Sequence, residues 1–315
     1  MHETRDPYTR SLSDLSPSQW VQEIKDLGET YGFFEPLGKN HTGTFIEKGD
    51  TLLVSLESLP AIQALSNEAR PAGFDIAQAN DWSCLSVVCN HDTWFRDKEV
   101  YAFFDQMTDD GFFEDFEKVI FYGAGPCGYA ACAFSVAAPG AIVVALEPQA
   151  TLDPRVTEWD DRFTHMRRTD FTDRYGYAPD MLEAAEAAYV VYDPASPLDA
   201  MHAALFERSG ITRFRARHMS NGMQARLEQL DALEPLVTTA ADGTLDDTVF
   251  SRLYRARRNH VGYCKRLFAA VEARGHPSMT EAVCAYIVNN FGGPRYRRKL
   301  NDLRKTRTVP KDEDA

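Results

Sequence analysis

The residues with the clearest chemical potential form a glycine-rich turn between a predicted buried strand and a predicted helix. The strand is the apolar run 118–122, and the turn from Gly123 to Gly128 reads GAGPCG. Glycines at a helix N-terminus permit unusual backbone dihedral angles, and the N–H groups there attract negative charge. Two chemistries use such a turn: the binding of a dinucleotide and nucleophilic catalysis.

The first interpretation is a dinucleotide-binding fingerprint. Gly123, Gly125 and Gly128 match the pattern G-x-G-x-x-G, and Glu147 closes the next predicted strand, where an acidic side chain meets a ribose hydroxyl. The segment 119–147 resembles the first βαβ unit of flavin- or nicotinamide-dependent oxidoreductases, which have a Rossmann fold. That resemblance implies that these four residues bind FAD or NAD(P).

The second interpretation is a nucleophile elbow without its nucleophile. An elbow needs a strand, a G-x-nucleophile-x-G turn and a helix, and Gly125 occupies the nucleophile position here. Asp193 ends a later predicted strand, and His218 follows the next one. The order nucleophile, acid, histidine resembles that of α/β-hydrolases, which implies an α/β-hydrolase-like fold with a degenerate elbow. Since glycine has no hydroxyl, a serine ester is excluded.

Cys127 is a candidate to replace the missing hydroxyl. A thiol in the first turn of a helix can have a lowered pKa and act as a nucleophile. Together with Asp193 and His218 it forms the candidate catalytic set. The alternative for Cys127 is a small packing residue.

Arginines mark a candidate anion site after the strand that Glu147 closes. About forty residues there have little apolar periodicity and include Arg167, Arg168 and Arg174. They are predicted to lie at the carboxyl end of the sheet, where open α/β sheets bind ligands. These side chains either bind a small anion such as a phosphate or uronate, or pair with nearby aspartates within an ordered loop.

Hydrophobic patterning predicts the elements that position these groups. Seven short apolar runs are typical of strands, and helices separate the later ones. The predicted strands cover residues 44–46, 52–56, 83–88, 118–122, 142–146, 188–192 and 212–215. We therefore predict an α/β domain over residues 41–235, with a mostly parallel sheet sandwiched by helices. Residues 1–40 are predicted to form an N-terminal tail and a helix that begins at the Ser16-Pro17 cap.

Residues 236–315 show helical periodicity alone, which predicts a small all-α C-terminal domain. Between Val249 and Arg307 fourteen Lys and Arg face three Asp and Glu, a local charge of +11 against about −24 elsewhere. These basic helices either bind an acidic protein partner or polyanion, or form a solvated face that docks onto the acidic domain.

Composition limits the class of protein. The chain has 315 residues, of which 44% are hydrophobic and 26% charged, and these values are typical of a globular protein. A net charge of −13 argues against general nucleic-acid binding. Six cysteines without CxxC spacing argue against a zinc site or a disulfide framework. The sequence shows no signal peptide and no apolar stretch of membrane-spanning length, so we expect a cytoplasmic protein.

Three functions remain open from the sequence. The first is a pseudoenzyme: an α/β-hydrolase-like protein without a serine nucleophile, with a non-catalytic role or one in binding a small anion or saccharide. The second is an oxidoreductase that binds FAD or NAD(P). The third is an adaptor that binds a protein partner through the basic C-terminal helices. No cofactor is favoured for the pseudoenzyme, whereas the oxidoreductase alternative implies FAD or NAD(P).

Overall fold

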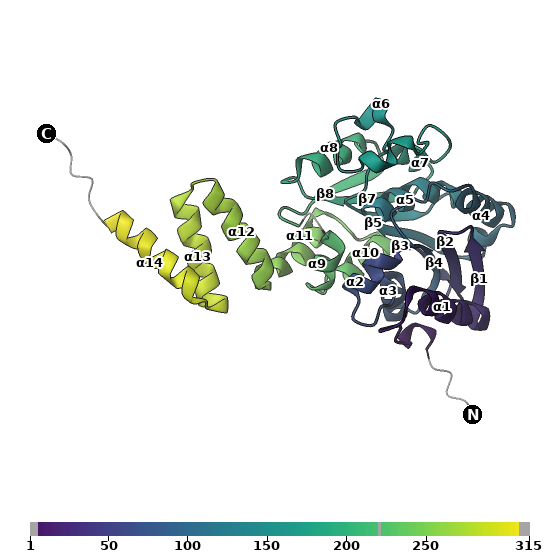
Figure 1. The fold of residues 1–315 in the computed structure, drawn as a ribbon, viewed down its shortest axis with the longest axis horizontal. Helices are drawn as coiled ribbons and strands as arrows, with labels where there is room; N and C mark the ends of the chain where they lie inside the picture. The colour runs from purple at the N-terminus through teal and green to yellow at the C-terminus, as the bar shows by residue number, and fades with distance from the viewer. Residues whose placement is uncertain (1–5, 220–221, 309–315) are drawn as a thin grey trace. The chain divides into compact units, whose positions relative to one another are not determined.

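The alternating strands and helices build one eight-stranded sheet (Figure 1). This computed structural model describes residues 6–219 and 222–308. The strands are β1 (Gly32–Leu37), β2 (His41–Ile46), β3 (Thr51–Ser58), β4 (Ser83–Cys89), β5 (Lys118–Ala124), β6 (Ile142–Leu146), β7 (Ala187–Tyr192) and β8 (Ile211–Arg215). Their order across the sheet is β1-β2-β4-β3-β5-β6-β7-β8. β2 runs antiparallel to both of its neighbours, and every pair from β4 to β8 is parallel.

This architecture confirms the predicted fold class. The main helices of the domain are α1 (Pro17–Tyr31), α2 (Leu59–Leu65), α3 (Ala72–Asn80), α4 (Lys98–Asp109), α5 (Pro126–Phe134), α8 (Pro197–Leu205), α9 (Met223–Glu228) and α10 (Leu233–Ala241). α1, α3 and α10 pack on one face of the sheet, and α4, α5 and α8 cover the other (Figure 1). Two short helices, α6 (Pro154–Thr157) and α7 (Ala178–Met181), lie in the connection between β6 and β7.

The local signals that begin α1 work as the sequence predicts. The Ser16 hydroxyl accepts a hydrogen bond from the Gln19 N–H, and the Gln19 side chain accepts one from the Ser16 N–H. Trp20, Ile24 and Leu27 then point into the core. This reciprocal cap satisfies two N–H groups that a helix start otherwise leaves unpaired.

Two features of the sheet differ from the prediction. β1 is an additional strand, because Gly32–Leu37 pairs with β2 in a hairpin. β2 and β3 are not neighbours although they follow one another in the chain; β4 lies between them. The position of β4 between β2 and β3 arises from pairing between strands that are distant in the chain, which apolar patterning within each strand does not encode.

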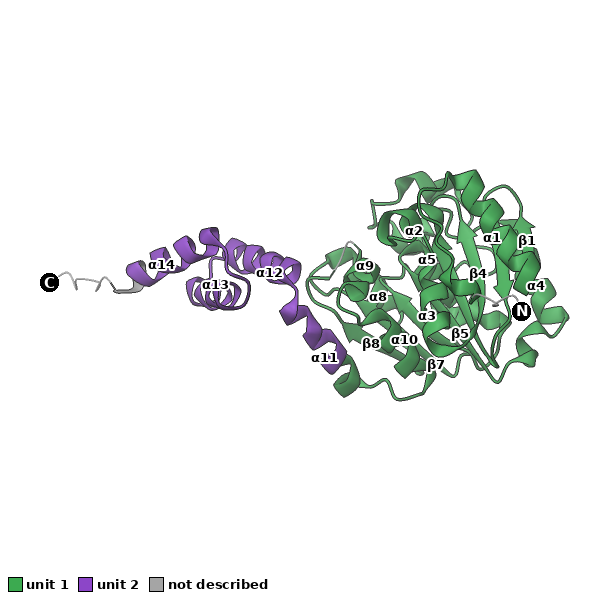
Figure 2. Ribbon diagram, turned by 90° about the horizontal axis from the view of Figure 1, so that it is seen from below, with its two compact units in different colours: residues 1–250 green, residues 251–315 purple. Residues whose placement is uncertain are grey.

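The structure divides into two compact units, residues 1–250 and 251–315 (Figure 2). The boundary lies later than residue 235 because α10 packs against α3, β5 and β6, so it belongs to the sheet domain. The N-terminal helix α1 also belongs to that domain, since it packs on β1 and β2. α11 (Asp247–Arg255) spans the boundary, and the Phe250 ring stacks on Phe214 of β8 with ring centroids 4.4 Å apart.

The second unit is helical, as predicted. It contains α12 (Val261–Ala273), α13 (Pro277–Phe291) and α14 (Pro294–Thr308), which pack in succession. Phe268 of α12 meets Tyr296 of α14 edge-on, with ring centroids 5.1 Å apart. Among the described helices of the chain, none combines the length and apolar character needed to cross a membrane.

Candidate functional site

The glycine turn after β5 has the backbone of a nucleophile elbow. Gly125 has φ 58° and ψ −123°, a region that side chains enter only under strain, and α5 begins at the next residue. The Gly125 N–H donates a hydrogen bond to the Leu146 carbonyl oxygen at 2.7 Å. A Cβ built on Gly125 would meet nothing within 4 Å. The turn therefore leaves open the space where an elbow displays its reactive side chain.

Two further glycines let α5 approach the strand closely. A Cβ on Gly123 would lie 2.2 Å from the Cys127 carbonyl oxygen, and one on Gly128 would lie 3.0 Å from that of Leu146. These neighbours are main-chain atoms, so they cannot rotate away. Close packing of strand and helix thus accounts for Gly123 and Gly128 without a ligand.

Pro126 removes a second part of the hydrolytic machinery. In an elbow, the N–H of the residue after the nucleophile helps to bind the negatively charged oxygen of the intermediate. Here that residue is Pro126, the first residue of α5, which has no N–H. The turn consequently lacks both the attacking hydroxyl and one of its two oxyanion donors. This missing donor could have been recognised from the sequence, because Pro126 directly follows Gly125.

Cys127 is a packing residue in this structure. Its side chain belongs to the central apolar cluster and is 7% exposed. Contact with the Cys89 thiol and burial together raise the pKa of the Cys127 thiol well above its ordinary value. An activated nucleophile requires the opposite shift, so the geometry gives no support to a reactive thiolate.

Asp193 and His218 both follow strands, at the carboxyl edge of the sheet. The Asp193 side chain follows β7 and is 1% exposed, and its oxygens accept hydrogen bonds from the N–H groups of Ala195 and Met219, each at 2.8 Å. His218 precedes Met219, is half-buried and has φ 65°. Asp193 therefore anchors the segment that carries His218.

Glu147 lies beside the turn because it follows Leu146, whose carbonyl oxygen accepts a hydrogen bond from the Gly125 N–H. Its own φ is 48°, an uncommon value for a side chain of this size. Oε2 accepts a hydrogen bond from the Met223 N–H at 3.3 Å, while Oε1 is buried and has no hydrogen-bond partner among the described residues. Burial, reinforced by the nearby Asp199 carboxylate, raises the pKa of Glu147 to about 7. The edge thus holds a carboxyl group with one uncommitted oxygen.

The three candidate arginines do not form a common site in the described part of the chain. The Arg174 guanidinium pairs with Asp105 at 2.7 Å and lies over the Tyr101 ring. Arg167 and Arg168 are exposed at the end of a short 3-10 helix. Arg174 is thus neutralised by a carboxylate of α4, outside the loop that carries the arginine.

A buried network that the sequence reasoning missed holds the same loop against α8. The His202 Nε2 lies 2.9 Å from an Asp160 carboxylate oxygen, and its Nδ1 accepts the Ala150 N–H at 3.2 Å. Arg162 bridges Asp160 and Asp199 at 2.8 and 2.6 Å. Because both ring nitrogens are committed, His202 is a positioning residue. The sequence offered one signal of this network: Asp199 and His202 are three residues apart, a spacing that places both on one face of a helix.

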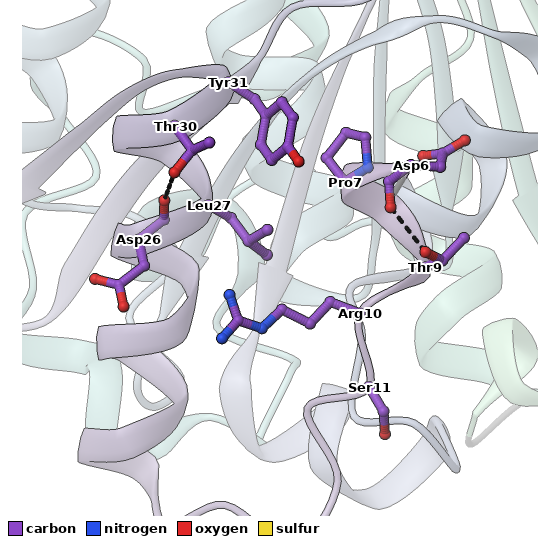
Figure 3. Close-up of a pocket in the computed structure, with 9 residues that line it drawn as sticks. All are labelled: Asp6, Pro7, Thr9, Arg10, Ser11, Asp26, Leu27, Thr30 and Tyr31. Atoms are coloured by element: carbon purple, nitrogen blue, oxygen red, sulfur yellow. Dashed lines mark hydrogen bonds between the residues drawn. The ribbon is translucent and has the colours of Figure 1, made fainter. Parts of the chain in front are cut away.

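A separate pocket lies away from the elbow. It has a volume of about 580 Å³ and lies between the N-terminal segment and α1 (Figure 3). Asp6, Arg10, Asp26 and Tyr31 are among its lining residues. None of the candidate catalytic residues lines it, so it adds nothing to the chemistry of the sheet edge.

Comparisons with known proteins identify no family for this chain. No protein-family model and no curated protein sequence matches the chain. Solved structures that resemble it include a thermostable carboxylesterase cloned from a metagenomic library, with 14% identity and a TM-score of 0.43 over 74% of this chain and 99% of that one. An esterase from the archaeon Pyrobaculum calidifontis has 13% identity and a TM-score of 0.40 over 73% and 92%. The capsule O-acetyltransferase of Neisseria meningitidis serogroup A has 8% identity and a TM-score of 0.40 over 62% and 92%.

The chain has an α/β-hydrolase-like fold. The strand order, the antiparallel β2 and the sharp turn after β5 define it independently of any single relative. In a dinucleotide-binding sheet of order 3-2-1-4-5-6, the glycine-rich turn follows the first strand. Here four strands precede β5, and β3 lies beside it. Nothing in the structure therefore favours the FAD or NAD(P) interpretation of Gly123, Gly125, Gly128 and Glu147.

Proposed function

We propose that this α/β-hydrolase-like protein is non-catalytic and binds a small hydroxylated ligand, such as a saccharide, at the carboxyl edge of its sheet. The carrying observation is the turn itself: Gly125 has the strained elbow backbone and open space beside it, but no reactive group. Pro126 removes the adjoining oxyanion donor. A turn that keeps the shape of the elbow but lacks both the nucleophilic hydroxyl and this N–H donor is suited to binding rather than to acyl transfer.

Charge at the edge favours a neutral ligand over an anion. The carboxylates of Asp199 and Asp193 lie close enough to Glu147 to add to the rise in the pKa of its carboxyl group that burial causes. Arg174, the cation expected to balance an anion, is paired with Asp105 instead. Carboxyl oxygens accept hydrogen bonds from sugar hydroxyls, and the free Oε1 of Glu147 is the acceptor that we assign to this contact.

A pair of variants tests the lack of catalysis. We expect the wild-type protein to form no adduct with a fluorophosphonate probe, as judged by intact-protein mass spectrometry. Gly125→Ser should label slowly, because it restores only the hydroxyl. Gly125→Ser combined with Pro126→Ala should label about a hundredfold faster, since one oxyanion donor is worth roughly 10²–10³ in rate. Hydrolysis of p-nitrophenyl acetate by the wild-type protein that is lost in His218→Ala would overturn the proposal.

Ligand class is tested with matched sugars. Glucose, galactose and mannose are compared with the corresponding uronates by thermal denaturation, because a ligand that binds only the folded protein raises its melting temperature. We expect at least one neutral sugar to stabilise the wild-type protein and Glu147→Gln to abolish the shift. Stabilisation by uronates alone, or by none of the sugars, would contradict the proposal.

A further inference from the structure

The helical unit carries a positive surface that its own acidic residues do not balance. Residues 251–308 contain fourteen Lys and Arg against three Asp and Glu, whereas residues 1–250 contain nineteen against forty-one. Two of the three acidic side chains form ion pairs within the unit: Glu272 with Lys299, and Glu281 with Arg304. Most of the positive charge therefore faces solvent.

The beginning of α14 concentrates this charge. Arg295, Arg297 and Arg298 are exposed in its first turns, with no acidic residue in the first turn. None of these three guanidinium groups has an ion-pair partner among the residues that the structure describes. Cations are unfavourable there because the N-terminal end of a helix is itself partly positive. An anionic partner would relieve that repulsion.

The sheet domain presents a surface of the opposite charge. Two adjoining pockets of about 260 and 390 Å³ form one groove, since Ala72, Asp75 and Glu228 line both of them. The elements around it are α2, α3, α9 and α10 (Figure 1). Its acidic lining residues are Glu57, Glu68, Asp75, Glu228, Asp231 and Glu234.

The groove has little positive charge of its own. Among the described residues that line the two pockets, Arg70 is the only basic one, and it pairs with Asp75 at 2.7 Å. Burial raises the pKa of Asp75 and of Glu228, and the neighbouring carboxylates Glu68 and Asp75 add to the respective shifts. The groove is therefore a place where incoming positive charge stabilises carboxylates that are otherwise held close together.

Exposed apolar side chains occur both on the helical unit and in the groove lining. Met279 and Tyr286 of α13 are 53% and 38% exposed, and Leu65 in the groove lining is 39% exposed. Their burial would add a contact that salt does not screen. Complementary charge with a small apolar centre is the usual composition of a specific protein interface.

We propose that the basic helical unit of one copy of this chain binds the acidic groove of a second copy, with the N-terminal turns of α14 facing the groove carboxylates. Each copy has a net charge of −13. The Debye length of about 8 Å at physiological ionic strength confines the interaction to the charges that face one another. Local complementarity therefore outweighs the net repulsion between the two copies.

Sedimentation velocity of the full chain at 150 and 600 mM NaCl tests the proposal. We expect concentration-dependent association at 150 mM and a dissociation constant at least about tenfold higher at 600 mM. Arg297→Glu with Arg298→Glu should abolish association. Arg252→Glu with Arg255→Glu makes the same charge change at exposed positions of α11 and should leave association in place. A protein that stays monomeric at every concentration and salt would overturn the proposal.

A charge swap distinguishes the groove from other acidic surfaces. Glu68→Lys with Asp231→Lys reverses two exposed groove residues and should also give a monomer. Mixing this variant with the Arg297→Glu, Arg298→Glu variant should restore a heterologous pair, because each supplies the charge that the other needs. Association that survives both reversals, or no recovery on mixing, contradicts the assigned surfaces. Circular dichroism establishes whether each variant is folded. If the α14 variant does not fold, the groove variant alone still tests the proposal.

Discussion

Replacing Gly123 by alanine is expected to prevent the protein from folding. The new Cβ would lie 2.2 Å from the carbonyl oxygen of Cys127 and 2.9 Å from the amide nitrogen of Gly128. Both atoms belong to the first turn of α5, so relief requires the whole helix to move away from β5. Every residue of α5 from Cys127 to Phe134 is buried, and that movement would open the core. We expect a loss of more than about 4 kcal/mol, which approaches the total stability of many domains.

Urea denaturation and the yield of soluble protein measure this effect. Gly140→Ala is the matched control, because a Cβ at Gly140 would meet no atom within 4 Å although its φ is +84°. That variant carries only the backbone cost of a left-handed residue, roughly 1–2 kcal/mol. If Gly123→Ala unfolds at the same urea concentration as Gly140→Ala, the close contact between strand and helix is not essential, and the elbow packing described here is wrong.

The fold class could be predicted because each strand carries its own signal. The run 142–146 is apolar without a break and is fully buried as β6, and the same holds for most of β3, β4 and β7. β1 escaped prediction because Gly32–Leu37 contains Glu35 and Pro36 and has only one buried residue. An edge strand tolerates such residues and so lacks the apolar pattern that identifies a central strand.

The candidate site was predictable only in part. Gly125, Asp193 and His218 follow strand ends, and parallel strands bring their carboxyl ends to one edge of the sheet. The burial of Cys127 could not be predicted from the sequence, because it depends on how closely α5 packs against β5. The pairing of Asp160 with His202 joins residues that lie forty-two positions apart. That contact exists only once the loop after β6 folds over α8.

Glu147 is expected to make the stability of the protein depend strongly on pH. In the unfolded chain its carboxyl group titrates near 4.5, whereas burial raises the pKa in the folded protein to about 7. Between these values the folded state holds a proton that the unfolded state has released, so stability falls as pH rises. The contribution is fully present below pH 4.5 and is lost by the time the pH has passed 7. A difference of this size corresponds to about 3 kcal/mol.

Other buried groups make it necessary to isolate this contribution with a variant. Burial lowers the pKa of His41 to about 4, and it also lowers the pKa of His202. Below pH 6.5 these two groups make stability rise with pH, which is opposite to the effect of Glu147. Burial raises the pKa of Glu57 to about 7, but Glu57 accepts the N–H groups of Ala72 and Gly73. An amide at position 57 would place its NH₂ group against one of them. Glu147 has no such constraint at Oε1.

Glu147→Gln should therefore gain stability relative to the wild-type protein as the pH rises from 5 to 8, by about 2.5 kcal/mol in total. Glutamine keeps an oxygen for the Met223 N–H and places its NH₂ group where the carboxylate has an uncommitted oxygen. Urea denaturation at pH 5, 6, 7 and 8 measures the difference. Glu158→Gln, at an exposed position of the same loop, is the control and should differ from the wild-type protein by no more than about 0.5 kcal/mol at each pH. A constant difference for Glu147→Gln over this range would show that the folded protein binds no extra proton at Glu147, and the carboxyl group would then be an ordinary carboxylate at the sheet edge.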